Sequence, residues 1–170
     1  YNKAIIELNR AIKTDPSMFL AHYNLGTAYM LTKSYNKAEL SFKACLKIKS
    51  NHEPTLYNLA RVYQNKKEWI NSNEIFKKFI KIQGPDSSVY SQVAWNNLMS
   101  GNLGEANTLY EKVLSYEPNH IPALINLGKI NYRLGKYEIS KSYIKRALKQ
   151  GLSQTQADDL NKLLKKLSIY

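Results

Sequence analysis

This sequence of 170 residues has few cysteines and no long apolar run, and each of these absences excludes a class of protein. It has one cysteine, Cys45, which excludes a disulfide framework and a cysteine-based zinc site. No apolar run approaches the roughly 18 residues of a membrane span, and no basic-then-apolar signal segment opens the chain. Cys45 stands in a repeated column of small and apolar residues, which predicts a buried packing residue rather than a reactive thiol.

Residues with catalytic chemistry are also few. The three histidines are His22, His52 and His120. His52 and His120 occupy equivalent loops and are expected to be solvated, whereas His22 is expected to pack. No zinc-protease, P-loop or nucleophile-elbow pattern occurs. The sequence therefore predicts no enzyme, no metal ligand and no cofactor.

Acidic residues are outnumbered: 13 Asp and Glu stand against 25 Lys and Arg, which gives a net charge of +12. Such a balance is found in proteins that bind nucleic acids or membrane surfaces. Here the lysines are scattered rather than clustered, and many, such as Lys77 and Lys78, fall on the second helix of a predicted repeat. We interpret most of this charge as belonging to solvated faces.

One spacing dominates what the sequence does contain. Gly26, Ala60, Ala94 and Gly128 are separated by steps of 34 residues, and each follows an aliphatic residue. The same step relates two further columns: Ala4, Ala38, Ser72, Ala106 and Ser140, and Leu8, Phe42, Phe76, Tyr110 and Ile144. No insertion breaks this register, and a fixed period of this length is typical of a repeat solenoid.

Each repeat predicts two helices with a close approach between them. In the first whole repeat the helices are expected at 19–32 and 35–49, joined by a turn at Lys33. Gly101 and Gly135 hold the turn position in later repeats, which indicates that this position needs a positive φ. Small residues in the Gly26 column would let the two helices approach.

The register also predicts how the chain is divided. Residues 1–18 would supply the second helix of a partial repeat, 19–154 four whole repeats, and 155–170 a C-terminal capping helix. A capping-box pattern at 153–156 marks the start of that last helix. About eleven helices are expected: one, then two in each repeat, then one or two at the end. Because the chain begins halfway through a repeat and without Met, we expect it to be an excised piece.

The residues of this pattern resemble a known family. Asn24-Leu25-Gly26 with Tyr29, Tyr35 and Ala38, and Asn126-Leu127-Gly128 with Tyr137 and Ala147, are similar to the tetratricopeptide repeat. The likeness covers residues 1 to about 154, with departures at Phe79, Asn97, Asn131, Ser72 and Ser140. It implies a right-handed α-solenoid of antiparallel helix pairs, protein–protein binding in a concave groove lined by the first helices, and no intrinsic catalysis.

The resemblance and the period together select candidate groove residues. A carboxamide recurs once per repeat at Asn24, Asn58, Gln92 and Asn126, and a side-chain amide both donates and accepts hydrogen bonds. The predicted peptide-binding residues are Tyr23, Asn24, Thr27, Tyr57, Asn58, Arg61, Gln92, Trp95, Asn126, Lys129 and Arg133. This ladder resembles the one in O-linked N-acetylglucosamine transferase, which holds extended peptides. The alternative is that the amides bond only within their own repeat.

Three hypotheses about function follow. The first is a scaffold that binds an extended, acidic or C-terminal segment of a protein partner, although the cations of a standard carboxylate clamp are missing. The second is the tetratricopeptide portion of a larger enzyme, such as a glycosyltransferase. The third is an RNA-binding helical repeat, which we disfavour because a base-reading pair does not recur in each repeat. The sequence indicates neither compartment nor oligomeric state.

Overall fold

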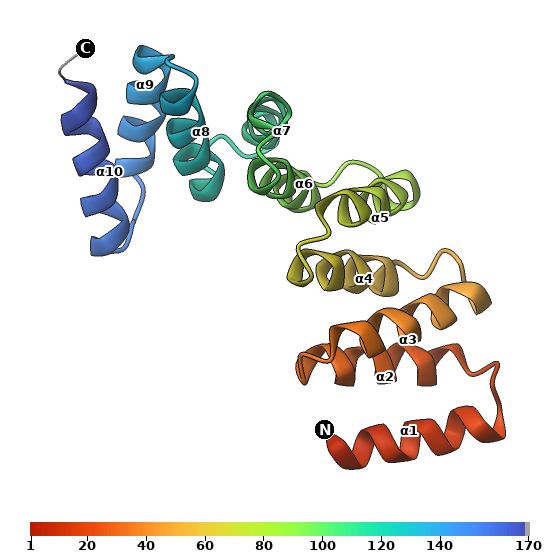
Figure 1. Ribbon diagram of the computed structural model, residues 1–170. Coiled ribbons are helices and arrows are strands. Elements are labelled where there is room, and N and C mark those ends of the chain that lie inside the picture. Colours follow the sequence, from red (N-terminus) through yellow and green to blue (C-terminus); the bar gives the residue numbers. More distant parts are fainter. Residues whose placement is uncertain (169–170) are drawn as a thin grey trace. The chain divides into compact units, whose positions relative to one another are not determined.

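The structure is a computed structural model that describes residues 1–168, and there it consists of ten helices and no strand (Figure 1). The helices are α1 Asn2–Thr14, α2 Phe19–Leu31, α3 Tyr35–Ile48, α4 Glu53–Asn65, α5 Trp69–Gln83, α6 Ser87–Met99, α7 Leu103–Tyr116, α8 Ile121–Arg133, α9 Tyr137–Leu148 and α10 Gln154–Leu167. The predicted all-α fold is confirmed. None of the described helices is both long enough and apolar enough to cross a membrane.

The helices form two compact units, Tyr1–Pro85 with α1 to α5 and Asp86–Tyr170 with α6 to α10. In the first unit α2 pairs with α3 and α4 with α5, while α1 packs on α2 and α3 on α4. In the second unit α6 pairs with α7 and α8 with α9, while α7 packs on α8 and α9 on α10. Each unit is thus a segment of α-solenoid. We call α2, α4, α6 and α8 the first helices, and α1, α3, α5, α7 and α9 the second helices.

The turn inside each pair has the backbone conformation that the sequence predicted. Lys33 and Lys67 have φ values of 58° and 60°, and Gly101 and Gly135 have values of 85° and 73°. In the first of these turns the Ser34 N–H donates to the Tyr29 carbonyl oxygen at 2.8 Å, which satisfies one of the carbonyls left open at the end of α2. Glycine adopts this conformation without strain, whereas the two lysines adopt it at a cost.

The small residues of the Gly26 column lie where the two helices of a pair touch. A Cβ atom placed on Gly26 would lie 2.6 Å from Cδ1 of Phe42, and one placed on Gly128 would lie 2.7 Å from Cγ1 of Ile144. Phe42 and Ile144 are fully buried. Both pairs therefore use glycine to bring a first helix against a large side chain of the second.

Two departures from the repeat pattern introduce buried polar side chains, and each has a partner. The Asn131 amide donates to Asn107 Oδ1 at 2.8 Å and to the Leu127 carbonyl oxygen at 2.9 Å. The Ser140 hydroxyl donates to the Gly128 carbonyl oxygen at 2.7 Å. Because a buried polar group is costly only when it lacks a hydrogen bond, these substitutions fit the core.

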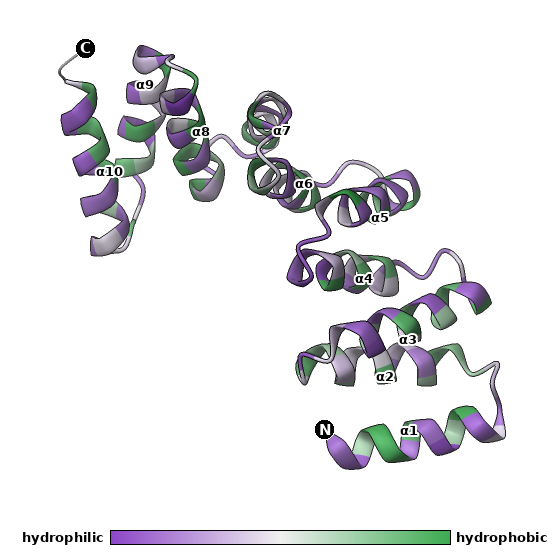
Figure 2. Ribbon diagram, in the orientation of Figure 1, coloured by the Kyte–Doolittle hydropathy of each residue, from purple (hydrophilic) through white to green (hydrophobic). Residues whose placement is uncertain are grey.

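The C-terminal helix α10 begins at the predicted capping box. The Ser153 side chain accepts from the backbone N–H of Gln156, and the Gln156 side chain accepts from the backbone N–H of Ser153. Leu160 and Leu167 are buried, and Figure 2 shows hydrophobic and hydrophilic residues on different sides of α10, which packs on α9. The last two residues of the predicted capping helix, 169 and 170, lie outside the described residues. The role of α10 as a cap stays a prediction.

The prediction that His52 and His120 are solvated loop residues is wrong. Both are half-buried and stand at the N-terminal caps of α4 and α8. His52 Nδ1 lies 2.7 Å from Thr55 Oγ1, and His120 Nδ1 accepts from the Ala123 N–H at 3.2 Å. The His120 nitrogen thus accepts a hydrogen bond at the helix start as a cap oxygen does, whereas His52 contacts the side chain of Thr55 and caps no backbone N–H.

Candidate functional site

All the predicted groove residues lie on first helices, and they fall into two groups. The first unit carries Tyr23, Asn24 and Thr27 on α2 and Tyr57, Asn58 and Arg61 on α4. The second unit carries Gln92 and Trp95 on α6 and Asn126, Lys129 and Arg133 on α8. Each unit therefore presents its own first-helix face, which we define by these residues.

The two tyrosines of the first unit are used in packing. The Tyr23 ring lies 6.1 Å from the Phe42 ring and 5.2 Å, edge-on, from the imidazole of His52. The Tyr57 ring lies 5.8 Å from the Phe76 ring and 6.0 Å from that of Phe79. Both tyrosines are half-buried. Aromatic pairs at these distances stabilise the fold, so these rings offer a partner only part of their surface.

The recurring carboxamides of the first helices differ in their exposure and in their hydrogen bonds. Asn24 is exposed, and Asn58 Nδ2 lies 3.4 Å from the Tyr23 hydroxyl, the outer limit of a hydrogen bond. Asn126 Nδ2 donates to the Tyr110 hydroxyl at 2.9 Å. This bond joins α8 to α7 of the preceding repeat, so it is not the predicted alternative, in which the amides bond only within their own repeat. A carboxamide has a second N–H and an acceptor oxygen, so one donated bond does not use up its capacity.

The cations of both groups are exposed. Arg61 in the first unit, and Lys129 and Arg133 in the second, all project from the ends or middle of first helices into solvent. Thr27 is half-buried and donates its hydroxyl to the Tyr23 carbonyl oxygen at 3.0 Å. The positive charge on these faces would attract an acidic ligand, and salt would screen that attraction.

A cleft of about 430 Å³ lies in the second unit, between α6 and α8. Three predicted groove residues, Gln92, Trp95 and Asn126, line it together. Its other lining residues are Ser88, Ser91, Tyr110, His120 and Pro122, which were absent from the predicted set. The period does carry a signal for one of them, because Ser91 falls in the column that holds tyrosine in the first two repeats.

The floor of this cleft, which we call the α6–α8 cleft, is polar but neutral. The Tyr110 hydroxyl is buried there, and burial raises the pKa of Tyr110 well above its ordinary value. Tyr110 therefore keeps its proton and can donate it. His120 Nδ1 accepts from a backbone N–H, so the neutral imidazole carries its proton on Nε2. Trp95 lies at the rim with 41% of its surface exposed.

A second cleft, of about 590 Å³, lies in the first unit between α1 and α2. Asn24 and Thr27 line it, together with Tyr1, Ala4, Glu7, Leu8, Ala11, Ala28 and Leu31. Tyr57, Asn58 and Arg61 are not part of its lining. The predicted residues of the first unit are thus not gathered around one cleft, whereas Gln92, Trp95 and Asn126 of the second unit are.

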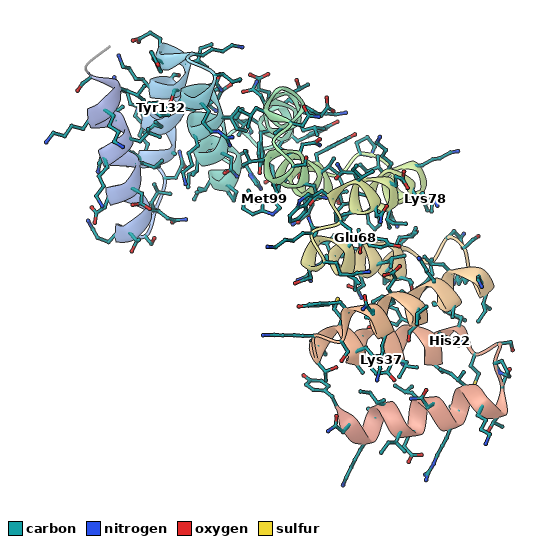
Figure 3. The ribbon with its side chains drawn as sticks, viewed as in Figure 1. His22, Lys37, Glu68, Lys78, Met99 and Tyr132 are labelled. Atoms are coloured by element: carbon teal, nitrogen blue, oxygen red, sulfur yellow. The ribbon has the colours of Figure 1, made fainter. Side chains whose placement is uncertain are left out.

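A third cleft, of about 430 Å³, lies at the turns of the first unit and contains none of the predicted residues. Its lining includes Lys33, Lys37 and Lys66. Lys66 pairs with Glu39 at 2.6 Å and with Glu68 at 2.8 Å, so part of its charge is neutralised (the neighbouring Lys37 and Glu68 are labelled in Figure 3). Among residues 1–168 no group of three or more His, Cys, Asp or Glu side chains is placed to hold a metal ion.

Comparisons with known proteins agree with this architecture. Two family profiles described as tetratricopeptide repeat match residues 20–52 and 97–164. The structure is similar to that of MamA, with a TM-score of 0.79 and 21% identity over 93% of this chain and 89% of that one. It also resembles YrrB, described as a TPR protein with an unusual peptide-binding site, with a TM-score of 0.70 and 13% identity over 85% and 74%.

A further similar structure is the first TPR domain of Spaghetti (RPAP3) bound to the HSP90 peptide SRMEEVD. Its TM-score is 0.62, with 22% identity over 69% of this chain and 93% of that one. No curated protein matches the sequence. At these identities the structural likenesses show the fold alone. The two profile matches, the unbroken 34-residue period and the stacked helix pairs show that the chain belongs to the tetratricopeptide repeat family.

Proposed function

We propose that this chain is a protein-interaction scaffold that binds an extended segment of a protein partner on its first-helix faces. The observation that carries the proposal is the α6–α8 cleft, where Gln92, Trp95 and Asn126 come together. Its volume of about 430 Å³ falls within the roughly 300–1,000 Å³ of sites that bind small groups. Two proteins that share the fold support it: YrrB, described as having an unusual peptide-binding site, and the RPAP3 domain, bound to an HSP90 peptide.

The side chains of this face suit a peptide. A carboxamide that pairs with main-chain N–H and C=O groups holds an extended segment without regard to its sequence. Each such bond contributes about 0.5–1.5 kcal/mol net, so the amides alone would give weak binding. The partly exposed indole of Trp95 supplies the apolar anchor that a peptide interface needs, and Lys129 and Arg133 favour an acidic segment.

The net charge of +12 supports RNA binding as a second candidate function. Exposed Arg61, Lys129 and Arg133 would contact phosphates, and the affinity would then fall steeply with salt. A titration of single-stranded RNA at two salt concentrations separates the two candidates. Peptide binding should fall less steeply between the same two salt concentrations, because salt screens only the contribution of Lys129 and Arg133 and not the neutral contacts of the amides and the indole.

The direct test uses extended peptides selected from a random library on the intact chain. Trp95→Ala should weaken the selected peptides by about tenfold or more, since a buried aromatic anchor is worth at least 1–2 kcal/mol. Ile139→Ala is the matched control, because Ile139 is 46% exposed and lies on α9, a second helix of the same unit. Equal losses in the two variants, or a loss with Ile139→Ala alone, would contradict the first-helix assignment.

A further inference from the structure

The α6–α8 cleft has a counterpart in the first unit, two repeats earlier. Stepping back by two periods from Ser91, Tyr110, His120 and Asn126 gives Tyr23, Phe42, His52 and Asn58, in that order. The four positions occupy equivalent places on first helices, on a second helix and at a helix cap. The first unit therefore shows what occupies this space when the column holds a tyrosine.

In the first unit the space is filled by a phenol ring. The Tyr23 ring packs against Phe42 at 6.1 Å and edge-on against His52 at 5.2 Å. Its hydroxyl lies 3.4 Å from Asn58 Nδ2, so a carboxamide meets the oxygen of the ring. Tyr57 stands in the same column of the next repeat and likewise packs on a phenylalanine, Phe76, at 5.8 Å.

In the second unit the equivalent surrounding residues are present, but no tyrosine ring fills the space between them. Ser91 stands in place of Tyr23, and the residues around it, Tyr110, His120 and Asn126, line an open cleft. The Asn126 amide, which has no Tyr23 hydroxyl to meet, turns to the hydroxyl of Tyr110 at 2.9 Å. A volume of about 430 Å³ stays open, so the surrounding side chains do not fill the space that a tyrosine at position 91 would occupy.

We propose that the α6–α8 cleft binds an aromatic side chain, phenylalanine or tyrosine, of the partner segment, in the place that Tyr23 fills in the first unit. This rests on the proposed function and adds the chemical class of the residue that the site selects. The His120 imidazole and the rim indole of Trp95, which both line the cleft, provide aromatic contacts.

The polar groups of the cleft suit the oxygen of a tyrosine. Tyr110 carries a hydroxyl where Phe42 carries none, and its buried proton is available to a ligand oxygen, because the hydroxyl accepts from Asn126 and keeps its own donor. His120, which also lines the cleft, carries a second donor at Nε2. A phenol oxygen accepts both, whereas phenylalanine or an aliphatic side chain would leave them without a partner inside the cleft, so of the two aromatic residues tyrosine fits better.

The test titrates the intact, ¹⁵N-labelled chain with p-cresol and with 4-methylcyclohexanol, its saturated counterpart, by NMR. We expect p-cresol to shift the Trp95 indole and the Ser91 and Asn126 amide signals in a saturable way, with an affinity at least fivefold above that of the saturated compound. Ser91→Tyr should abolish these shifts because its own ring fills the cleft. Ser91→Ala, which leaves the cleft open, should retain them.

Circular dichroism confirms that each variant is folded, and the comparison of the two compounds on the unmodified chain stands even if Ser91→Tyr does not fold. Equal affinity for the two compounds, or shifts away from the α6–α8 cleft, would overturn the proposal. Peptides selected on the chain test the function separately. If they bound the Ser91→Tyr and unmodified chains equally and lacked aromatic residues, the ring site would fail while the scaffold function stood. If p-cresol bound in the cleft and no peptide could be selected, the scaffold function would fail while the ring site stood.

Discussion

Replacing Gly26 with alanine tests how closely the two helices of a repeat approach. The new Cβ atom would lie 2.6, 2.7 and 3.0 Å from three carbon atoms of the Phe42 ring. Carbon atoms in favourable contact are about 3.5–4.0 Å apart. Phe42 is fully buried, so either its ring or helix α2 has to move.

The expected cost follows from two opposing effects. Overpacking of a core costs about 1–3 kcal/mol, while alanine improves on glycine in a helix by about 0.8–1 kcal/mol. Because three atoms of a rigid ring are involved, we expect Gly26→Ala to lower the free energy of unfolding by about 1–2 kcal/mol. Ala60 and Ala94 stand in the same column of the next repeats, so the fold accepts alanine where the pair is spaced for it.

Urea unfolding followed by far-ultraviolet circular dichroism reports on the helices of both units. Gly104→Ala is the control, because Gly104 lies in helix α7 and a Cβ atom added to it would meet nothing within 4 Å apart from its own stretch of helix backbone. That change should leave stability unchanged or raise it by up to about 1 kcal/mol. If Gly26→Ala behaved like Gly104→Ala, the close approach would not explain the glycine.

Two further predictions concern the ends and surface of the chain. Burial raises the pKa of Glu39, but hydrogen bonds from Lys43 and Lys66 outweigh this effect and hold the pKa of Glu39 below its ordinary value. The stability that ionised Glu39 contributes is therefore complete above about pH 4.3, the ordinary pKa of a glutamate in the unfolded chain. It is lost as the pH falls through the lower pKa of the folded state. Glu39→Gln should therefore cost on the order of 1 kcal/mol at pH 7 and flatten the acid limb of a thermal-unfolding series, and an unchanged acid limb would refute this. Deleting residues 155–170 should lower the melting temperature or cause association in sedimentation, because the loss of the buried Leu160 and Leu167 uncovers an apolar face of the second unit. An equally stable, monomeric truncated chain would show that α10 is no cap.

Much of the fold could be predicted because the 34-residue period records which positions are buried. The Gly26 column, the turn at Lys33 and the capping box at Ser153 each depend on local backbone geometry, which the sequence of a single repeat determines. The division between Pro85 and Asp86 could not be predicted, since the register continues across it without an insertion.

The candidate site was harder to predict because its shape depends on side chains from several helices that lie side by side only in the folded chain. The period shows that Ser91 replaces a tyrosine, but only the structure shows that the surrounding side chains leave the space open. The cap role of His120 depends on an angle between an imidazole and a backbone N–H that no spacing encodes. The sequence predicts Tyr23 and Tyr57 as ligand contacts, and only the structure shows that their half-buried rings also pack on Phe42 and Phe76.

The measurement that tests the central claim most directly is photo-crosslinking of a selected peptide to the intact chain. A benzophenone amino acid replaces Lys129 on the first helix α8 in one variant and Lys145 on the second helix α9 in the other, both exposed positions of one unit. We predict that the peptide is captured at position 129 and not at position 145. Capture at position 145 alone, with none at 129, would contradict binding on the first-helix face.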